Sequence, residues 1–365
     1  MRHGERERID TLVIGGGQAG LAVGYHLEQR GVPFLIVDAN ERTGDAWRDR
    51  WDSLRLFTAN KFNGLPGMSY PDQSWSFATK DEIADFFESY AHHFDLPIRH
   101  SVEVTRLTRD GYRFVAVTED REYEADNVVV AMSNYQEPAV PEFAAELDPR
   151  IVQMHMVDYK NPGQLREGAV LVVGAGNSGA EIAAELVRGC HVLLSGPSTG
   201  QAPFRPERVS GRILIPILSR VILRVLNTST PIGKKARPKI LSRGAPLVRV
   251  KEKDLLRAGV ERVGRTVGVV DGYPELEDGR VVDVSNVVWC SGFEPGFSWI
   301  ELPVFDENGR VVHDRGVADA LPGLYFVGLR FSYSIASDTL LGVGRDAEHV
   351  VGKINDRRSV PQTVN

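Results

Sequence analysis

The hydrophobic pattern of this chain opens with a short apolar run that stops at a cluster of glycines. Residues 12–14 are continuously apolar, residues 18–30 carry apolar positions at helical spacing, and residues 34–38 hold a second short apolar run. Short apolar runs bounded by glycine are typical of buried strands, and the spacing between them is typical of a helix. The pattern therefore predicts a βαβ unit with two parallel strands.

The same pattern returns later in the chain. An apolar run at residues 170–173 meets a second cluster of glycines. Gly15 precedes Asn127 by 112 residues, and Asn127 opens another short apolar run. Gly174 precedes Asn286, which also opens an apolar run, by the same 112 residues. We therefore predict an α/β protein with two Rossmann-type dinucleotide-binding domains, of which the second is inserted in the first.

The predicted domain boundaries follow from this insertion. The first domain is expected to comprise residues 1–156 and 286–352, and the second domain residues 157–285. Residues 353–365 are polar and are expected to form a frayed, flexible tail.

Further elements are predicted between and after the two repeats. They are an amphipathic helix at residues 81–93, β structure at 98–130 with a hairpin turn at Asp110 and Gly111, a basic loop at 231–249, a strand at 322–328 and a final helix at 334–348.

Residues 211–230 are rich in aliphatic and arginine side chains. Their length and basic amphipathic character permit a helix on a membrane surface. Pro216 interrupts the apolar face, which favours a helix that packs over the cofactor cleft or at the interface of a homodimer.

Composition and charge exclude several classes of function. The 365 residues carry a net charge of −6, and the charges are dispersed, so no basic stripe indicates a nucleic-acid partner. Cys190 and Cys290 form no CxxC pair, which argues against a zinc site, a disulfide and a dithiol redox centre. Residues 1–8 lack the apolar core of a signal peptide, and no apolar stretch is long enough to form a transmembrane segment. We expect a cytoplasmic protein without a metal site.

Each glycine of the first cluster has its own expected role. Gly15 permits the tight turn, Gly17 leaves room for a pyrophosphate at the helix N-terminus, and Gly20 lets the helix pack close to the strand. Asp38 ends the second strand at a spacing suited to a hydrogen bond from a ribose hydroxyl. The residues assigned to this dinucleotide site are Gly15, Gly17, Gln18, Ala19, Gly20 and Asp38.

The second cluster repeats this arrangement with one chemical difference. The strand predicted at residues 191–195 ends in neutral Ser195, whereas the carboxylate of Asp38 would repel a 2′-phosphate. The first site therefore suits FAD and the second can accommodate NADPH. NADH remains an alternative because no arginine stands directly at Ser195. The residues assigned to the nicotinamide nucleotide are Gly174, Gly176, Asn177, Ser178, Gly179, Ser195 and Arg205.

The segment after Asp38 contains two tryptophans and several arginines. Trp47 and Arg48 could form a wall for a flat aromatic cofactor, with the arginine on its phosphates. The alternative is a surface loop anchored by Trp47 and Trp51. The residues alone favour neither interpretation.

Three residues outside the glycine clusters are also assigned to cofactor binding, namely Val104, Gly328 and Leu341. Gly328 ends a predicted buried strand, and Leu341 belongs to the predicted final helix. The small residues of that helix would let its N-terminus approach a ligand, where the helix dipole stabilises an anionic flavin ring.

These motifs resemble those of flavin-containing monooxygenases with two dinucleotide domains, a group that includes bacterial CzcO-like flavoproteins and plant YUCCA enzymes. The similar segments are residues 15–20, 47–58, 174–181, 289–293 and 324–328, and the similarity extends over nearly the whole chain. The resemblance implies a monooxygenase of the dimethylaniline-monooxygenase type that uses FAD, NADPH and O2. Through a C4a-hydroperoxyflavin it would transfer one oxygen atom to a small organic substrate, by N- or S-oxygenation or carbonyl oxidation.

The motif FxGxxxHxxx(Y/F) of this family matches only in its second half. His155 and Tyr159 are present, but Pro149 and Ile151 replace the Phe and the Gly. The half-match implies a linker that contacts the nicotinamide nucleotide; the alternative is that His155 and Tyr159 pack together one helical turn apart. The resemblance also implies that Asn60 helps to hold the oxygenated flavin, and the alternative is that it caps the following turn.

Two other functions stay open. An NAD(P)H-dependent flavin reductase or oxidase that releases peroxide is favoured by the incomplete motif. A flavin redox sensor that acts through a partner, linked to ion transport, belongs to a different class of protein. A disulfide reductase is disfavoured because the chain has no CxxC pair. Of these functions, the residues favour the monooxygenase.

Overall fold

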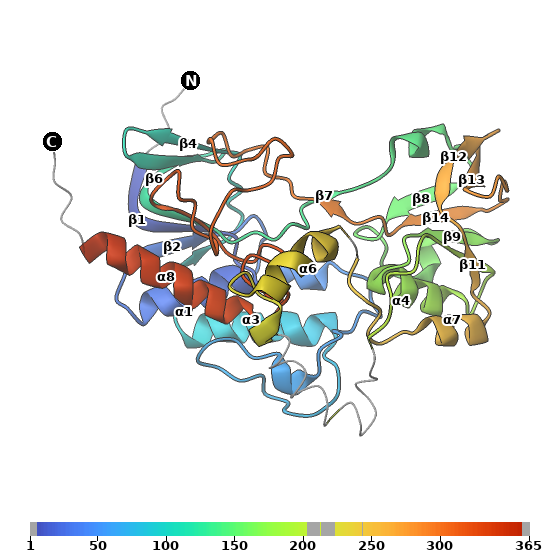
Figure 1. The fold of residues 1–365 in the computed structure, drawn as a ribbon, viewed down its shortest axis with the longest axis horizontal. Helices are drawn as coiled ribbons and strands as arrows, with labels where there is room; N and C mark the ends of the chain where they lie inside the picture. Colours follow the sequence, from blue (N-terminus) through green and yellow to red (C-terminus); the bar gives the residue numbers. More distant parts are fainter. Residues whose placement is uncertain (1–5, 203–211, 213–222, 243, 360–365) are drawn as a thin grey trace.

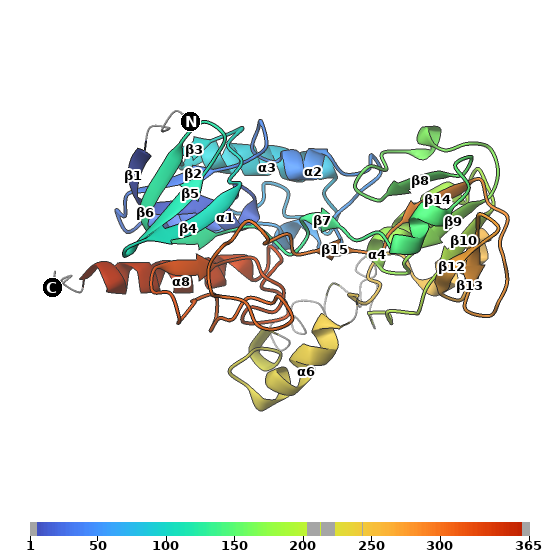
Figure 2. The same ribbon diagram turned by 90° about the horizontal axis from the view of Figure 1, so that it is seen from above.

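The computed structural model describes residues 6–202, 212, 223–242 and 244–359. Two sheets lie at opposite ends of the long axis of the molecule, as Figure 1 shows. Between them, β7 (Glu137–Pro138) and β15 (Phe293–Glu294) pair as a short antiparallel ribbon (Figure 2). The chain therefore passes from one sheet to the other and back along two neighbouring connections.

The first sheet has the strand order β3-β2-β1-β6-β5-β4, and β16 pairs with β6. Its strands are β1 (Arg6–Ile14), β2 (Phe34–Val37), β3 (Ile98–Arg99), β4 (Arg106–Asp110), β5 (Arg113–Val117), β6 (Glu122–Val130) and β16 (Leu324–Phe326). The central strands are parallel, with Ile14 paired to Val37 on one side and to Val130 on the other. The expected hairpin joins β4 and β5, whose end residues Asp110 and Arg113 are paired.

The second sheet is parallel throughout, with the order β11-β10-β9-β14-β8. Its strands are β8 (Val152–His155), β9 (Val170–Val173), β10 (Val192–Ser195), β11 (Glu261–Val263) and β14 (Asn286–Trp289). The hairpin of β12 (Thr266–Val270) and β13 (Tyr273–Leu276) follows β11 in the chain. In each sheet a strand, a glycine turn and a helix lead to a parallel neighbouring strand, β1 to β2 and β9 to β10, which is the Rossmann arrangement, so the predicted fold class is confirmed.

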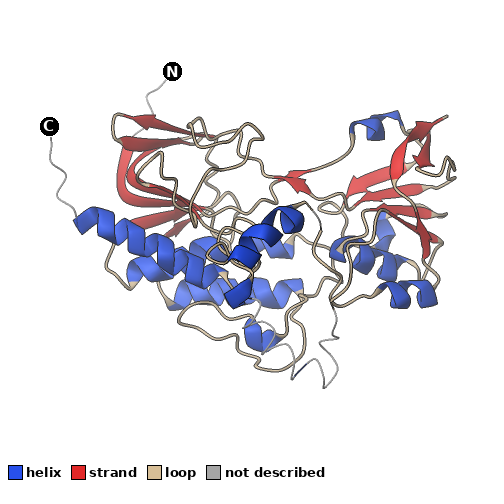
Figure 3. Ribbon diagram, in the orientation of Figure 1, coloured by secondary structure: helices blue, strands red, loops and turns tan. Residues whose placement is uncertain are grey.

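Helices α1, α3 and α8 lie below the first sheet and α4 and α7 below the second in the view of Figure 3, whereas α6 lies between the two sheets. They are α1 (Gln18–Glu28), α2 (Asp45–Arg48), α3 (Lys80–His93), α4 (Asn177–Leu186), α6 (Pro231–Leu241), α7 (Glu252–Ala258) and α8 (Val343–Ser359), with 3₁₀ turns η1 (Asn60–Phe62), η2 (Glu142–Glu146) and η3 (Pro162–Gln164). Helix α3 begins one residue before the predicted start because Thr79 and Glu82 form a reciprocal capping box. No helix in the described ranges is long and apolar enough to cross a membrane.

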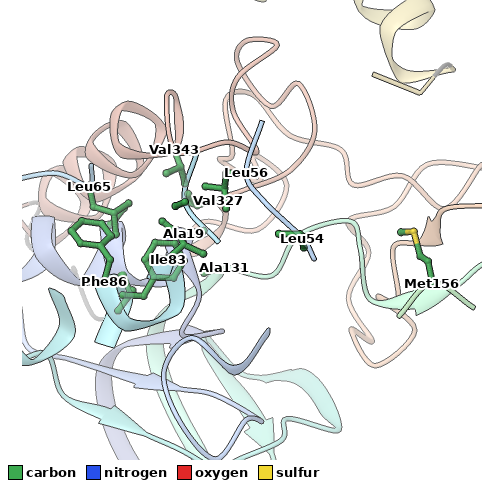
Figure 4. Packing of buried hydrophobic residues seen from close by; sticks show 14 of the residues in the cluster. Ala19, Leu54, Leu56, Leu65, Ile83, Phe86, Ala131, Met156, Val327 and Val343 are labelled. Carbon is green, nitrogen blue, oxygen red and sulfur yellow. The ribbon is translucent and has the colours of Figure 1, made fainter. Parts of the chain in front are cut away.

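A shared hydrophobic core connects the two sheets with the helices. Figure 4 shows Ala19 of α1, Ala131 after β6 and Val327 after β16 in this core. Leu54 and Met156, from two connecting segments, belong to the same cluster and carry it toward the second sheet. Removing such side chains from water contributes roughly 1.5–3 kcal/mol each for the larger aliphatic residues.

The sheets correct the predicted domain boundaries. β8 and β14 both belong to the second sheet, although the boundaries after residue 156 and before residue 286 assigned them to the first domain. Asn286 pairs with Val170 in the parallel register that Asn127 has with Thr11 in the first sheet. The repeat of 112 residues therefore describes the second sheet correctly, and the boundary at 286 cuts through it.

The C-terminal region differs from the prediction in two ways. The last helix begins at Val343 and not at residue 334, because the hydroxyl of Ser337 accepts hydrogen bonds from the Tyr333 and Ser334 N–H groups and holds a turn there. The helix then continues to Ser359, so the tail predicted at residues 353–365 is wrong for residues 353–359, and the rest of it lies outside the described residues. Ile354 is fully buried and fixes this end of the helix.

Residues 231–249 were predicted as a loop, but α6 occupies most of this stretch. Its first residue is Pro231, and the Thr230 hydroxyl caps it by accepting from Gly233 N, which is a favourable start for a helix. Most of the segment 211–230 lies outside the described residues. Its final part lies against the C-terminal region, where Thr228 N donates to Tyr333 O at 2.8 Å.

Candidate cofactor site

A cavity of about 760 Å³ lies between the glycine turn of the first sheet and α4 of the second sheet. Its walls come from β1, α1, the segment 38–58, the strand ends of the first sheet, the N-terminal part of α4 and the connection at Phe293. The residues assigned from the sequence that line it are Gly15, Gly17, Gln18, Ala19, Asp38, Trp47, Val104, Asn177, Ser178 and Gly328.

The first glycine turn has the geometry that the sequence implies. Gly15 has a φ of +107°, which a residue with a side chain rarely adopts. A Cβ on Gly20 would overlap the Gly15 carbonyl oxygen, so the helix can approach the strand only with glycine at this position. A Cβ on Gly17 would meet no atom within 4 Å, which leaves open space at the N-terminus of α1.

The second turn repeats these features residue by residue. Gly174 has a φ of +113°, and a Cβ on Gly179 would overlap the Gly174 carbonyl oxygen. Gly176, like Gly17, faces open space. Gly174 N donates to Ser195 O at 2.9 Å, as Gly15 N donates to Val37 O at 2.8 Å. The three glycines of this turn do not line the cavity themselves, although the next residues on α4 do.

Asp38 stands at the end of β2 and points back to the turn. Its carboxylate accepts hydrogen bonds from Gly16 N and from the backbone and side-chain amides of Asn40, the last at 2.7 Å. The side chain is 8% exposed and lines the cavity. A buried carboxylate held at the end of the second strand can accept ribose hydroxyl groups.

The segment 45–58 contributes both tryptophans to the cavity wall. Trp51 is 5% exposed, and its buried Nε1–H has no hydrogen-bond partner. Such a donor needs an acceptor, and a ligand in the cavity can supply one. Trp47 and Trp51 therefore combine the two roles between which the sequence could not choose. Trp51 belongs to the buried core, Trp47 packs against it, and both line the cavity.

Arg48 does not line the cavity, contrary to the expectation that it meets cofactor phosphates. Its guanidinium donates to Thr43 O at 2.8 Å and pairs with Asp45 and Asp85 at 3.0 and 2.8 Å. These partners turn it toward α3. Arg50, which was not assigned to the site from the sequence, lines the cavity instead. Its guanidinium carbon lies 5.6 Å from the centre of the Phe293 ring.

Leu341 and Ser195, also assigned from the sequence, lie away from the cavity. Leu341 is 37% exposed, and its neighbour Leu340 lines the wall instead. Ser195 is fully buried, and its hydroxyl donates to Gly264 O at 2.9 Å and accepts from Thr266 N at 3.0 Å, so it is not free to face a nucleotide. Arg205 lies outside the described residues.

Asn60, the expected catalytic residue, is occupied within its own loop. Its amide nitrogen donates to Asp72 at 2.8 Å and to Ser76 at 3.1 Å, and it does not line the cavity. Hydrogen bonds from Ser74, Asn60 and Ser76 to the Asp72 carboxylate hold its pKa at about 2. The structure therefore gives Asn60 an organising role in the loop that covers residues 60–76.

The side chains of His155 and Tyr159 have different hydrogen-bond partners. The His155 ring is hydrogen-bonded to Gly292 O at 2.9 Å and meets the Phe293 ring edge-on. The Tyr159 hydroxyl donates to Glu185 at 2.8 Å. Neither side chain lines the cavity, whereas the intervening Met156 does.

Two acids in the cavity wall that were not assigned from the sequence have raised pKa values. Asp338 is half-buried, and its carboxylate accepts a hydrogen bond of 3.0 Å from the Tyr135 hydroxyl; desolvation raises the pKa of this carboxyl. Burial also raises the pKa of Glu181, on α4, to about 7. Glu181 follows Asn177 by four residues and so shares its helix face, a signal that the sequence does contain. Asp338 has no comparable signal.

Comparisons with known proteins agree with this arrangement. Residues 12–328 match the family described as pyridine nucleotide-disulphide oxidoreductase. An uncharacterized CzcO-like oxidoreductase of Geobacillus kaustophilus is 39% identical over 348 residues, which cover 95% of this chain and 98% of that protein. The probable indole-3-pyruvate monooxygenase YUCCA9 of Arabidopsis thaliana is 29% identical over 333 residues, or 82% of this chain and 78% of that one.

Among solved structures, a flavin-containing monooxygenase from Stenotrophomonas maltophilia is similar with a TM-score of 0.76 and 26% identity, covering 97% of this chain and all of that one (100%). The chain therefore belongs to the pyridine nucleotide-disulphide oxidoreductase family, in the group of flavin-containing monooxygenases and CzcO-like proteins. The family predicted from the motifs is confirmed.

Proposed function

We propose that this protein is an FAD-dependent monooxygenase that is driven by NADPH and transfers one oxygen atom of O2 to a small organic substrate. The observation that carries the proposal is the shared cavity. The N-termini of α1 and α4, which follow two equivalent glycine turns, both border this one space of about 760 Å³. Two dinucleotides bound at these turns would bring their reactive rings into the same cavity.

The residues present fit a flavin dinucleotide at the first turn. The open space at Gly17 can take a pyrophosphate, for which the N–H groups at the start of α1 are the natural donors. Asp38 would accept the ribose hydroxyls, and the unpaired Nε1–H of Trp51 would donate to the cofactor. FAD, when bound, supplies the hydride acceptance and the reaction with O2 that no side chain of the chain can perform.

The chain's own contribution is to bind, to exclude water and to hold a proton. Leu54, Leu56 and Phe87 present apolar surface to the cavity, which keeps water from reactive species there. The hydroxyl of Tyr135 holds its proton toward Asp338 at 3.0 Å. Because burial raises the pKa of Asp338, this pair can exchange a proton with the cavity more readily than an exposed carboxylate could.

NADPH is favoured over NADH at the second turn. Strand β10 ends in Ser195 and itself carries no carboxylate that would repel a 2′-phosphate, although the Glu252 carboxylate lies 3.7 Å from the guanidinium of Arg262 beside it. Arg262 lies at the same strand end, where it donates to Leu194 O at 2.8 Å and to Gly196 O at 2.7 Å. A guanidinium in this place favours an additional phosphate.

A second function, an NAD(P)H-dependent flavin oxidoreductase without oxygenation, is favoured by one observation. His155, one of the two matching residues of the incomplete monooxygenase motif, is bonded to Gly292 O and does not line the cavity. In such an enzyme, NADPH oxidation would yield only peroxide.

The two functions are separated by following the oxygen atoms. The FAD-loaded protein would be incubated with NADPH, ¹⁸O₂ and a panel containing a tertiary amine, a thioether and a 2-oxo acid or ketone. One ¹⁸O atom in a product, with less than one peroxide per NADPH, supports the monooxygenase. Full conversion of NADPH to peroxide with every substrate class would contradict it.

A further inference from the structure

Arg249 joins the two halves of the cavity wall. Its Nη1 donates to Arg55 O at 2.9 Å, and its guanidinium carbon lies 5.3 Å from the centre of the Phe77 ring. The same Nη1 lies 3.4 Å from each carboxylate oxygen of Glu181 on α4. Glu181 and Arg55 both line the cavity, one from each half. A single side chain thus contacts the units that carry the first and the second glycine turn.

The backbone that carries Arg249 is fixed to the second unit. The side chain of Asn177, the first residue of α4, donates to Pro246 O at 3.1 Å and accepts from Val248 N at 3.0 Å. The segment before Arg249 is therefore attached to the start of the helix that follows the second glycine turn. Arg249 extends from this attachment to the other unit.

The groups that receive Arg249 are fixed to the first unit. Arg55 forms a β-bridge with Thr79, the residue that caps α3, and its own guanidinium donates to Phe77 O at 2.9 Å. Both ends of the contact are thus anchored in ordered structure. Any rotation of one unit relative to the other at this edge must break the contact or move an anchored segment.

We propose that Arg249 is a positioning residue that holds the two dinucleotide-binding units at one separation, with Glu181 as its counter-charge and as the group that weakens this hold on protonation. The role of Arg249 in holding the two units follows from these contacts alone. Its consequence for turnover rests on the proposed function, because the separation of the units sets where the nicotinamide nucleotide meets the flavin.

The charge balance at this contact depends on few groups. The side chains of Arg249 and Glu181 are 20% and 13% exposed, and Arg249 is the charged group that acts on the Glu181 carboxyl. Burial raises the pKa of that carboxyl to about 7, against the opposing effect of Arg249. Above this pH both Arg249 and Glu181 are charged. Below it Glu181 is neutral, so Arg249 keeps only its contacts with the Arg55 carbonyl and the Phe77 ring of the first unit.

A matched control exists in the first sheet. Arg113 is also 20% exposed and pairs with Glu124 and Asp126 on the neighbouring strand, away from the cavity. Arg113→Gln therefore removes a guanidinium of equal exposure from an ion pair within one unit. Arg249→Gln removes a guanidinium from an ion pair between the two units. Arg249→Lys keeps the positive charge but lacks the planar guanidinium group.

The test measures the separation of the units directly. Nitroxide labels would be placed at two exposed positions, Asp120→Cys in the first unit and Lys253→Cys in the second, with Cys190 and Cys290 replaced by alanine. Distances from double electron–electron resonance would be compared at pH 6 and pH 8. We expect a narrow distribution for the parent and Arg113→Gln at pH 8, broadening for Arg249→Gln at both pH values, and an intermediate result for Arg249→Lys.

Glu181→Gln should show the same distribution at pH 6 and pH 8, because it cannot ionise. An Arg249→Gln distribution equal to that of the parent at pH 8 would overturn the inference. These distances need neither NADPH nor O2, so they stand whether or not the proposed function does. In a parallel rate assay, Arg249→Gln should slow NADPH-dependent flavin reduction about tenfold, mainly through KM, with partial rescue by Arg249→Lys.

Discussion

The carbonyl oxygen of Gly15 occupies the space that a Cβ on Gly20 would need. The carbonyl oxygen of Gly174 stands in the same relation to Gly179 in the second unit. In both units this contact lets a helix N-terminus approach the end of a strand, and both helix starts border the shared cavity. The duplicated contact is therefore the local cause of the two-site arrangement on which the proposed function depends.

Alanine at Gly20 and alanine at Gly179 should each impair a different nucleotide site. Each added methyl overlaps a backbone oxygen that cannot move without the strand, so each variant should lose about 1–3 kcal/mol of stability. Gly20→Ala should also purify with little FAD. Gly179→Ala should keep FAD but lose reduction by NADPH. Chemical denaturation and the flavin absorbance measure both effects.

Gly352→Ala is the control for these variants. Gly352 lies in α8, and a Cβ there would meet no atom within 4 Å, so the exchange should stabilise the helix by about 0.5–1 kcal/mol. Equal behaviour of Gly20→Ala and Gly352→Ala would show that the close contact at Gly20 is not required.

Gly17→Ala should affect binding without affecting folding. The backbone at Gly17 has φ of −76°, which alanine adopts freely, and its Cβ would point into open space. The melting temperature of the FAD-free protein should stay unchanged, whereas the Kd for FAD should rise at least tenfold because the methyl group occupies the pyrophosphate position. Isothermal titration of the FAD-free protein with FAD measures this Kd. An unchanged affinity would show that the pyrophosphate does not bind beside Gly17.

Both glycine turns could be predicted from the sequence because their geometry is set by the backbone within a few residues. Side-chain directions were not predictable in the same way. Arg48 and Arg50 are both close to the tryptophans in sequence, but the acids of α3 attract Arg48 and leave Arg50 at the cavity. Asn60 was misplaced because its partners, Asp72 and Ser76, come from a loop whose path no local pattern indicates.

The start of the last helix was missed for a related reason. Residues 334–342 have helix-compatible spacing, but the Ser337 hydroxyl competes for backbone N–H groups and forms turns. The buried end of the helix could have been foreseen from Val351 and Ile354, which continue the apolar spacing.

Trp51→Phe should weaken FAD binding more than it weakens the fold. The buried Nε1–H of Trp51 has no partner, so its removal costs the FAD-free protein no hydrogen bond, whereas the holoprotein would lose one of about 1 kcal/mol. Trp299→Phe is the control, because Trp299 also lines the cavity but already donates to Gly296 O at 3.0 Å. Thermal unfolding with and without FAD compares the two; an equal loss in both forms of Trp51→Phe would contradict the assignment.

The titration of Glu181 should appear in the pH dependence of stability. Its pKa is raised in the folded protein from 4.5 to about 7, so the protonated side chain favours the folded state, and this contribution is lost as the pH rises from 4.5 through 7. A rise of this size corresponds to roughly 3 kcal/mol. Relative to Glu181→Gln, the parent should lose about this amount between pH 4 and pH 8. If the free energy of unfolding of the parent and of Glu181→Gln changed equally across this pH range, Glu181 would not titrate there.

Arg262→Gln should change the choice of nicotinamide nucleotide. The Arg262 guanidinium lies at the end of β10, where we propose that it binds the 2′-phosphate. Its loss should therefore raise KM for NADPH about tenfold and leave KM for NADH within about twofold. Initial rates of flavin reduction with each nucleotide measure this. An equal rise for both nucleotides would mean that Arg262 only supports the strand end.

The central claim is that the shared cavity supports oxygen transfer and not only electron transfer. The FAD-loaded protein would be reduced by NADPH without oxygen and then mixed rapidly with oxygenated buffer, while the flavin spectrum is recorded. We predict a transient absorbing species, distinct from reduced and oxidised flavin, that decays faster when substrate is present. Direct return to oxidised flavin with one peroxide per NADPH, with NADP⁺ bound and every substrate class present, would contradict the claim.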